Sequence, residues 1–260
     1  MLARRSDASL ERLLTMHSPG KAAPGVTRHP FLSQQSFPRL WTLFQYLIGG
    51  LNDKRELFCN LTTGARNILE VGCSVGLLAD PLKGKRGVNY TGIDIDQGAI
   101  DLAKKRHQSS PNVSFTCEHL VDFAAHARQM FDVAVFAAVL HHVDDDASCR
   151  MLDAVRQVVE AGGKIVAFDP LPPRESDGRF VRVFVRTFEQ GAFLRTEESS
   201  ARLVSRNGKY PLAATNVIPM HGTAFGFPVC EYLVSLEVRI PPAPRRTRPC
   251  GQGLPPTSPR

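Results

Sequence analysis

The sequence predicts an α/β fold, a doubly wound and mostly parallel seven-stranded sheet with helices on both faces, and three observations predict it. Short apolar runs of strand length alternate with longer runs of helical periodicity, which is typical of parallel strands joined by crossover helices. One strand-like run leads into a glycine turn at Gly72 and Gly76, where sheets of this class bind ligands. Of the 260 residues, 43% are apolar, which is enough for one substantial core.

Five apolar runs before residue 170 have the length of buried strands, so the core of the sheet is expected to be complete by that point. Two further runs follow, and we expect a glycine-rich loop over His221–Phe227 to join them. The seven predicted strands cover Ile68–Val71, Tyr90–Asp94, Val113–Cys117, Phe131–Phe136, Lys164–Phe168, Ala214–Met220 and Glu231–Val238.

Helical periodicity occupies four other stretches of the chain. Two of them are followed by paired glycines, Gly49-Gly50 and Gly162-Gly163, which we interpret as helix stops. The first predicted helix is expected to cover one edge of the sheet or to form a wall of the substrate site, and to make a small cap together with the segment after the fifth strand. The predicted helices cover 40–48, 99–103, 151–159 and 180–188.

The net charge of +7 is carried by the two ends of the chain. Residues 1–30 hold five Lys or Arg and two acids, residues 241–260 hold four Arg and no acid, and residues 31–240 carry 23 of each sign. Both ends are rich in Pro, Gly and Ser, which favours disorder, and the neutral body gives no reason to expect a nucleic-acid partner. The predicted units are a tail over 1–36, a domain over 37–240 with its cofactor half at 60–170 and its substrate and cap region at 171–240, and a tail over 241–260.

The six cysteines are scattered and form no C-x-x-C pair. This spacing argues against a zinc site and against a disulfide framework, so we expect reduced thiols in the cytoplasm. No apolar run approaches the length of about 18 residues that a membrane-spanning helix needs, and the first residues are polar with mixed charge, unlike a signal peptide. We therefore expect a soluble, cytoplasmic protein, and the oligomeric state stays open.

The turn after the first predicted strand discriminates between cofactors. A dinucleotide-binding fingerprint needs glycines at 72, 74 and 77, but these positions hold Gly72, Ser74 and Leu77. The pattern fails at two of three positions, so an NAD-dependent oxidoreductase is an alternative and not the preferred interpretation. Glu70, at the end of the strand, suits a cofactor with a positively charged ammonium group better than one with a phosphate.

Four motifs in the expected order resemble those of the class I S-adenosylmethionine-dependent methyltransferases, over roughly residues 37–170. They are Glu70–Gly76, Tyr90–Asp96, Phe131–Val143 and Glu160–Asp169. The resemblance implies a Rossmann-like fold, S-adenosyl-L-methionine as cofactor, and methyl transfer to a small-molecule acceptor that is a metabolite or a lipid-like compound. A methyltransferase-like protein that binds a partner without catalysis is the second alternative.

The resemblance also implies cofactor contacts. Asp94, which ends the second strand, would bind the ribose hydroxyls. Glu118 is a candidate for the adenine amino group, although a solvent-facing loop carboxylate is the favoured interpretation of this residue. Ser74 departs from the family pattern, which most often has a glycine there. The implied cofactor-binding residues are Glu70, Gly72, Cys73, Ser74, Gly76, Asp94, Ile95, Glu118 and Ala137.

Two histidines follow the fourth strand, where the resemblance puts them near the transferring methyl group. Methyl transfer is an in-line displacement in which the protein mainly positions the reactants, and one histidine would act as general base for a hydroxyl acceptor. We expect His142 to be the base because His141 lies closer to the strand end, although both could instead line the cofactor; His221 is the next candidate. A metal site of Asp144–Asp146 with Asp169 is disfavoured, because adjacent acids at a helix N-terminus are ordinary capping residues.

Nucleobases are not expected as acceptors. The fourth-strand motif lacks the Asn/Asp-Pro-Pro-aromatic sequence that positions a base amine, and no cysteine lies in the loop to attack a pyrimidine ring. Residues 174–209 carry eight basic and five acidic residues, a balance more typical of a solvated helix surface than of a site for an anionic acceptor. A small molecule is therefore the preferred acceptor.

Overall fold

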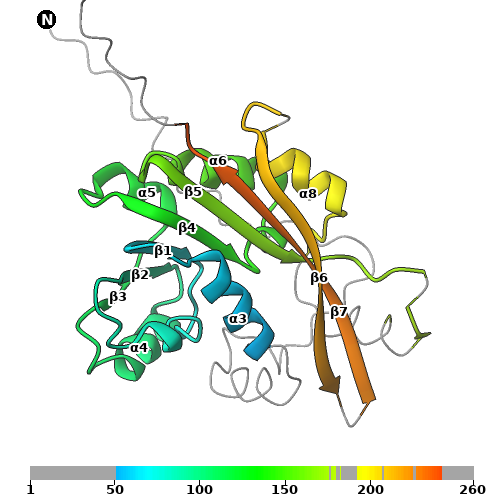
Figure 1. Cartoon of the computed structure of the whole chain (residues 1–260), viewed down its shortest axis with the longest axis horizontal. Helices are drawn as coiled ribbons and strands as arrows, with labels where there is room; N and C mark the ends of the chain where they lie inside the picture. Colours follow the sequence, from blue (N-terminus) through cyan, green and yellow to red (C-terminus); the bar gives the residue numbers. More distant parts are fainter. Residues whose placement is uncertain are drawn as a thin grey trace, which may run out of the picture.

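The computed structural model describes residues 51–241, apart from 176, 180–181, 183–191, 207 and 225–226. Its centre is a seven-stranded sheet (Figure 1) with the strand order β3-β2-β1-β4-β5-β7-β6. Strands β1 to β5 are parallel and β7 runs antiparallel to both of its neighbours, which confirms the predicted doubly wound, mostly parallel sheet. The strands are β1 Asn67–Val71, β2 Asn89–Asp94, β3 Val113–Cys117, β4 Phe131–Ala137, β5 Val159–Pro170, β6 Leu212–Ala224 and β7 Phe227–Arg239.

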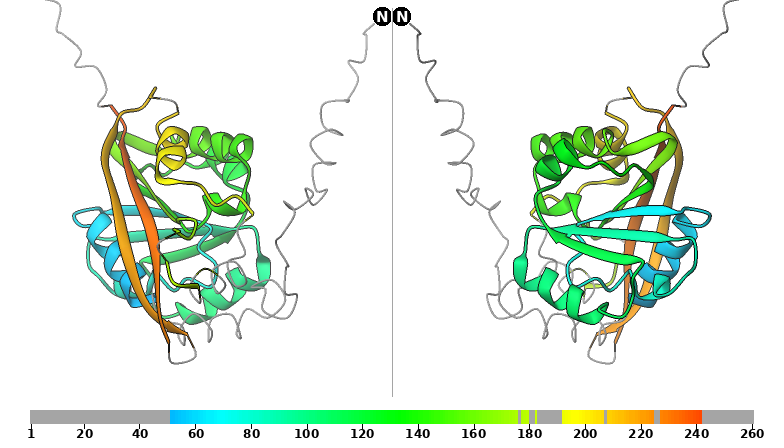
Figure 2. Two further views of the ribbon diagram at one scale, coloured as in Figure 1. Left: turned by 90° about the vertical axis from the view of Figure 1, so that its right-hand side faces the viewer. Right: turned by 90° about the vertical axis from the view of Figure 1, so that its left-hand side faces the viewer.

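Helices cover both faces of the sheet (Figure 2). On one face, α3 and α4 contribute Phe58 and Ile100 to a buried apolar cluster. On the other face, α5, α6 and α8 contribute Leu120, Leu152 and Val204 to a second cluster. The helices are α3 Leu51–Leu61, α4 Gln97–Arg106, α5 Leu120–His126, α6 Asp145–Val155 and α8 Glu197–Val204, with short 3₁₀ turns η2 Asp80–Leu82 and η3 Leu140–His142.

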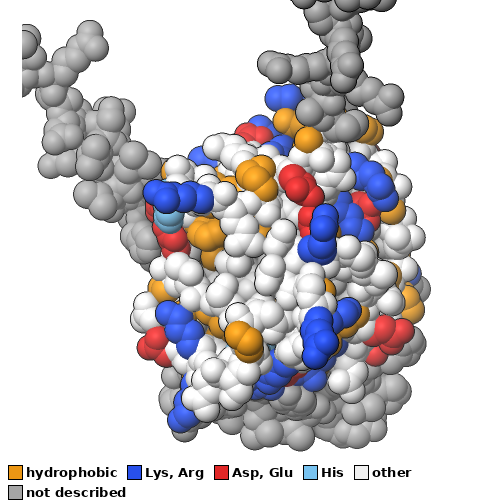
Figure 3. Space-filling view, turned by 60° about the vertical axis from the view of Figure 1, so that its left-hand side comes forward, with side chains coloured by type: hydrophobic (Ala, Val, Ile, Leu, Met, Phe, Trp, Pro, Cys, Tyr) orange, Lys and Arg blue, Asp and Glu red, His pale blue; other side chains and the backbone are white. Residues whose placement is uncertain are grey.

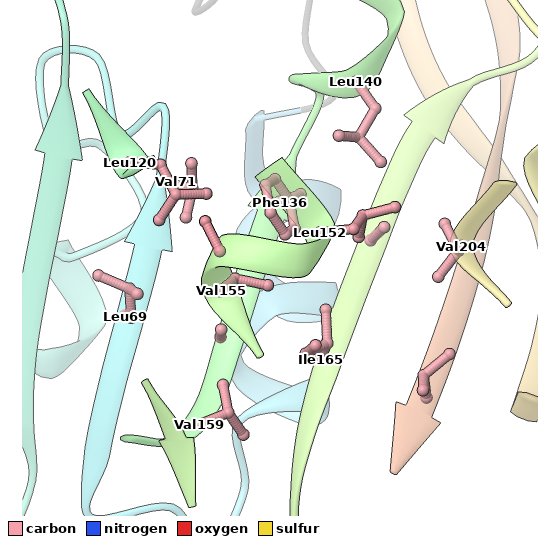
Figure 4. Close-up of a cluster of buried hydrophobic side chains, with 14 of the residues drawn as sticks. Leu69, Val71, Leu120, Phe136, Leu140, Leu152, Val155, Val159, Ile165 and Val204 are labelled. Carbon is pink, nitrogen blue, oxygen red and sulfur yellow. The ribbon is translucent and has the colours of Figure 1, made fainter. Parts of the chain in front are cut away.

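The alternation of side chains along β1 shows how the sheet divides the core. Ile68 joins the cluster under α3 and α4, whereas Leu69 and Val71 join the cluster on the opposite face. Figure 4 shows this second cluster, in which Phe136 of β4 and Ile165 of β5 also lie. All five side chains are at most 3% exposed, and burial of each contributes about 1.5–3 kcal/mol. This packing fixes the carboxyl ends of β1, β4 and β5 relative to one another.

The predicted helix over 99–103 is confirmed as α4, which Asp96 caps by accepting a hydrogen bond from the Ala99 amide at 3.1 Å. Helices α3, α5 and α8 were not predicted. Of these, α5 and α8 have only 7 and 8 residues, too few for helical periodicity to stand out. The predicted helix over 40–48, most of that over 180–188, the tail over 1–36 and all but residue 241 of the tail over 241–260 lie outside the described residues.

The predicted helix over 151–159 is wrong at its end. Helix α6 stops at Val155 and β5 begins at Val159, so Gly162 and Gly163 lie within a strand and do not end a helix. The pairing of β4 with β5 shifts register at this point, and Gly162 has a φ of +90°. Glycine adopts this conformation at little cost. The glycine pair therefore allows the strand to be irregular where its register with β4 shifts.

The hairpin of β6 and β7 is longer than predicted. The predicted loop over His221–Phe227 is wrong, because His221–Ala224 belong to β6 and pair with Phe227–Cys230 of β7. An antiparallel ladder satisfies the backbone groups of both strands, and this overrides the low strand propensity of the glycine within it. The hairpin extends past the end of β5 (Figure 1).

Basic and acidic side chains are interspersed on the face shown in Figure 3, with hydrophobic side chains scattered among them. The mixture agrees with the balance of charge in residues 31–240, which contain 23 basic and 23 acidic residues. Within the part of the chain that the structure describes, no helix has the length and the apolar character needed to cross a membrane.

Candidate functional site

The glycine turn, from Gly72 to Gly76, follows β1 and has a left-handed backbone at three positions. Gly72 and Gly76 have φ values of +72° and +70°, and Ser74 has +49°. A Cβ added at Gly72 would lie 2.6 Å from Cγ2 of Val139, and a Cβ at Gly76 would lie 2.7 Å from the ring of Phe115. Both positions therefore require glycine for conformation and for space.

A carboxylate at the end of β2 is bound to the glycine turn. The Ser74 amide donates to Oδ2 of Asp94 at 2.8 Å, and the Asp96 amide donates to Oδ1 at 2.9 Å. The left-handed conformation of a residue with a Cβ costs about 1–2 kcal/mol, which the hydrogen bond from Ser74 to a charged group offsets. Burial raises the pKa of the Asp94 carboxyl. The next residue in the chain, Ile95, has an exposed side chain, with 67% of its surface accessible to solvent.

Glu70 lies on the buried side of the glycine turn. It is only 2% exposed, and its carboxyl accepts a hydrogen bond from the Tyr90 hydroxyl. Burial raises the pKa of Glu70 to about 8, so the carboxyl is mostly neutral at pH 7. Burial also raises the pKa of the Cys73 thiol. Glu70 and Cys73 thus support the turn from the core, and the contact of Glu70 with an ammonium group stays a prediction.

His107, at the end of α4, is a further support of the glycine turn that sequence reasoning missed. Its Nε2 atom lies 2.9 Å from the carbonyl oxygen of Gly76. Its ring packs 5.2 Å from that of Phe115, which in turn lies 5.6 Å from the ring of Tyr90. The glycine turn therefore packs against the row of rings formed by His107, Phe115 and Tyr90. No motif marks His107, because the contact depends on the length of α4.

Two more predicted cofactor residues stand at neighbouring strand ends. The Glu118 amide, just after β3, donates to the Asp94 carbonyl at 2.9 Å. The Glu118 carboxylate lies 3.5 Å from Nε2 of His126, and the side chain is 21% exposed. Ala137 is the last residue of β4 and pairs with Phe168 of β5. Both residues thus lie at the edge of the sheet that carries the glycine turn.

The histidine turn is formed by residues 138–143 after β4 and includes η3. It begins with a left-handed residue, Ala138, at φ +56°. His141 is buried at 3% exposure, and its Nδ1 atom lies 2.6 Å from Oδ1 of Asp169, a residue near the end of β5. His142 is exposed, and the centres of the two imidazole rings are 4.0 Å apart. The two histidines therefore have different environments.

The glycine turn and the histidine turn meet at one edge of the sheet. Strands β1 and β4 are adjacent and parallel, with Val71 paired to Phe136, so their carboxyl ends lie side by side. Val139, two residues before His141, packs against Gly72. The arrangement brings most of the predicted cofactor residues and both predicted histidines to a single region, which is the geometry that a two-substrate transfer needs.

Two of the aspartates after the histidine turn have structural partners. Asp144 caps α6 by accepting from the Ala147 amide at 2.7 Å, and Asp145 pairs with Arg195 at 2.7 Å. No group of three His, Cys, Asp or Glu side chains among the described residues is arranged to hold a metal ion. His221 is part of β6 and not of a loop.

Sequence reasoning missed the roles of Asp169 and Arg195. Asp169 was weighed only as a metal ligand, and Arg195 was counted only among the basic residues of 174–209. A signal for Asp169 was available, because Asp169 lies one residue before the end of β5, much as Asp94 ends β2. Nothing in the sequence marked Arg195, whose contacts lie about 50 residues away.

Comparison with known proteins finds similarity to methyltransferases. A family model described as a methyltransferase domain matches residues 69–165. The ubiquinone biosynthesis O-methyltransferase of Coxiella burnetii is 31% identical over 106 residues, which is 40% of this chain and 44% of that protein. The match spans less than half the length of this relative.

Solved structures share the fold at low sequence identity. The N-methyltransferase NodS from Bradyrhizobium japonicum superposes with a TM-score of 0.54 at 18% identity, covering 74% of this chain and 97% of its own. The magnesium protoporphyrin IX methyltransferase from Synechocystis, with bound S-adenosylhomocysteine, superposes with a TM-score of 0.53 at 18% identity, covering 76% of this chain and 86% of its own. The chain thus has the fold of these enzymes.

Proposed function

We propose a function from one premise: residues 69–165 form a methyltransferase domain, within a chain that has the class I methyltransferase fold. The chain transfers a methyl group from S-adenosyl-L-methionine to a small-molecule acceptor, a metabolite or a lipid-like compound. The observation that carries the proposal is the 2.8 Å hydrogen bond from the Ser74 amide to Asp94. It holds a carboxylate beside a glycine backbone that a ligand can approach closely.

The residues at this edge fit the cofactor. Both Asp94 oxygens accept backbone N–H groups, and a lone pair that remains can accept a ribose hydroxyl. Ile95, which is 67% exposed, offers an apolar surface to the adenine ring. When bound, the cofactor supplies a methyl group on a positively charged sulfur. The other proposed contacts are Glu70, Gly72, Cys73, Ser74, Gly76, Glu118 and Ala137.

The histidine turn offers a proton acceptor. An ionised Asp169 can only accept a hydrogen bond, so Nδ1 of His141 donates to it at 2.6 Å and Nε2 carries the basic lone pair. A histidine oriented in this way suits removal of a proton from a hydroxyl group. We therefore assign the base to His141, the reverse of the order that the sequence favoured, and assign the exposed His142 to the wall of the acceptor site. The relative from Coxiella burnetii is itself named an O-methyltransferase.

Binding and product analysis test the proposal. Calorimetry is expected to show that S-adenosylhomocysteine binds and that NAD does not. At 100 times its dissociation constant the ligand should stabilise the fold by about 2.7 kcal/mol. Incubation with S-adenosylmethionine and a metabolite extract should give a product heavier by one methyl group. Tight binding of NAD with no binding of S-adenosylhomocysteine would overturn the proposal and favour an oxidoreductase.

We also propose a cytoplasmic location and a catalytic domain over 37–240 between two tails. Four of the cysteines, Cys59, Cys73, Cys117 and Cys149, are free thiols in the structure, which suits a reducing compartment. The first 30 and last 20 residues hold none of the residues named above. A chain tagged with a fluorescent protein and viewed in its host cell would test the location.

A further inference from the structure

We propose that Arg195 is a positioning residue of the acceptor site and that it holds the histidine turn through contacts separate from the bond to Asp169. The inference rests on the proposed function, because it gives Arg195 a part in methyl transfer. Its basis is a set of contacts that join the segment before α8 to the turn after β4. These contacts link two parts of the chain that are about 50 residues apart.

The guanidinium group of Arg195 donates to backbone carbonyls on both sides of the two histidines. Its Nη1 atom lies 2.7 Å from the Leu140 oxygen, and its Nη2 atom lies 2.8 Å from the Val143 oxygen. A planar guanidinium presents its donors in a fixed fork. The two carbonyls are therefore held at a fixed separation, and His141 and His142 lie between them.

The same guanidinium group anchors the turn to α6. Its Nε atom donates to Oδ1 of Asp145 at 2.8 Å, and Nη2 lies 3.4 Å from the hydroxyl of Ser148. The Arg195 side chain is 10% exposed, whereas that of Asp145 is 76% exposed. The arginine is thus the buried member of the pair, and its interactions are charge-assisted hydrogen bonds with little solvent competition.

The backbone of the same segment supplies one more contact. The Phe193 amide donates to the carbonyl of His141 at 2.9 Å. Three carbonyls of the histidine turn, those of Leu140, His141 and Val143, therefore accept hydrogen bonds from residues 193–195. A 3₁₀ turn of three residues has little stability of its own, so these external bonds determine its orientation.

The position of Arg195 depends in turn on α8. The next residue, Thr196, caps this helix by accepting from the Ser199 amide at 3.3 Å, and Leu203 and Val204 bury the helix against the core. His141, Asp169, Phe193 and Arg195 line one small pocket beside it. Arg195 therefore couples the docking of the region after β5 to the orientation of the proposed base.

Nuclear magnetic resonance tests this role without an acceptor. A buried Nδ1–H that donates to a carboxylate at 2.6 Å gives a slowly exchanging proton resonance far downfield. We expect the resonance of His141 in the wild-type protein, assigned by its absence from His141→Gln, and its loss or displacement in Arg195→Lys, which keeps the charge but not the fork. The matched control is Arg202→Lys on α8, whose side chain is 63% exposed and which should keep the resonance.

Two measurements keep the test decisive. The thermal midpoint of each variant shows whether it is folded, and the affinity for S-adenosylhomocysteine should stay near wild type in Arg195→Lys. If that variant does not fold, Asp145→Asn replaces it, because it removes the anchor of the guanidinium on α6 and leaves the buried groups in place; the resonance should then exchange faster. An unchanged resonance in the folded variant overturns the role of Arg195. Failure of the wild-type protein to bind S-adenosylhomocysteine overturns the proposed function instead.

Discussion

The glycine turn and the histidine turn lie side by side at one edge of the sheet but are held in different ways. In the glycine turn, conformation and space are determined at Gly72 and Gly76, and its carboxylate partner, Asp94, ends the very next strand of the chain. The histidine turn has a comparable partner in Asp169, near the end of the next strand. It also depends on Arg195, which is 55 residues away from the Leu140 carbonyl that it binds. One site can therefore combine a glycine turn that a local motif specifies with a histidine turn that depends on contacts distant in sequence.

The largest expected effect concerns the histidine turn. Replacing His141 by Gln removes the proposed base and should lower kcat by about 10²–10⁴, with the affinity for S-adenosylhomocysteine within a few-fold of wild type, because general base catalysis acts on the transition state. His142→Gln is the matched control and should cost less than about tenfold. Steady-state kinetics and calorimetry check both. Equal losses in the two variants would remove the distinction between the histidines.

A substitution in the glycine turn should be costly for folding. Gly72→Ala adds a Cβ 2.6 Å from Val139 in a left-handed conformation, and strain plus overpacking should lower the free energy of unfolding by about 2–4 kcal/mol. Gly84 is the matched control, since its φ is +67° and nothing lies within 4 Å of an added Cβ. Urea unfolding should give a loss of only about 1 kcal/mol for Gly84→Ala. Similar losses would show that space at Gly72 is not limiting.

The carboxylate beside the glycine turn should matter to cofactor binding. Asp94→Ala removes the proposed acceptor of the ribose hydroxyls, and at about 1.5–3 kcal/mol for a hydrogen bond to a charged group the affinity for S-adenosylhomocysteine should fall by about one to two orders of magnitude. Asp96→Ala removes only the cap of α4 and should weaken binding much less. Calorimetry that reversed this order would contradict the assignment of Asp94.

The buried acid beneath the glycine turn should make stability depend on pH. Glu70 has an ordinary pKa of 4.5 and a folded-state pKa of about 8, so the folded protein binds the proton more tightly. The free energy of unfolding should therefore fall as pH rises between these two values, by up to about 1.4 kcal/mol per pH unit. Glu70→Gln should flatten this part of the profile. An identical pH profile for the two proteins, measured by urea unfolding, would contradict the burial of a neutral acid.

The smallest effect is expected outside both turns. Deleting residues 1–30 and 241–260 should leave the thermal midpoint and the affinity for S-adenosylhomocysteine unchanged, because these segments have no apolar periodicity and hold none of the proposed site residues. A large drop in the thermal midpoint of the truncated chain would show that one of the tails packs on the domain.

Some elements could be predicted because their signal is local. The five parallel strands and α4 were found from runs of apolar residues, and the loss of two glycines from the dinucleotide fingerprint was visible at Ser74 and Leu77. The wrong predictions fall where the pairing of one strand with another determined the structure. The sequence predicts a helix stop at Gly162, but this glycine lies at the register shift between β4 and β5. It also predicts a loop at His221, but His221 pairs with β7.

The sequence by itself determined the order of the elements, the sheet class and the glycine turn, because periodicity, chain order and the steric demands of glycine act over a few residues. Only the tertiary structure decided that His141, and not His142, is held by Asp169, and that Arg195 holds the turn around it. The bond from His141 to Asp169 requires β4 and β5 to be neighbours in register, and the bonds of Arg195 require α8 to be docked on the core. Such contacts depend on the packing of the whole sheet. The position of Asp169 near the end of a strand is a local signal, but no local pattern records the contacts of Arg195.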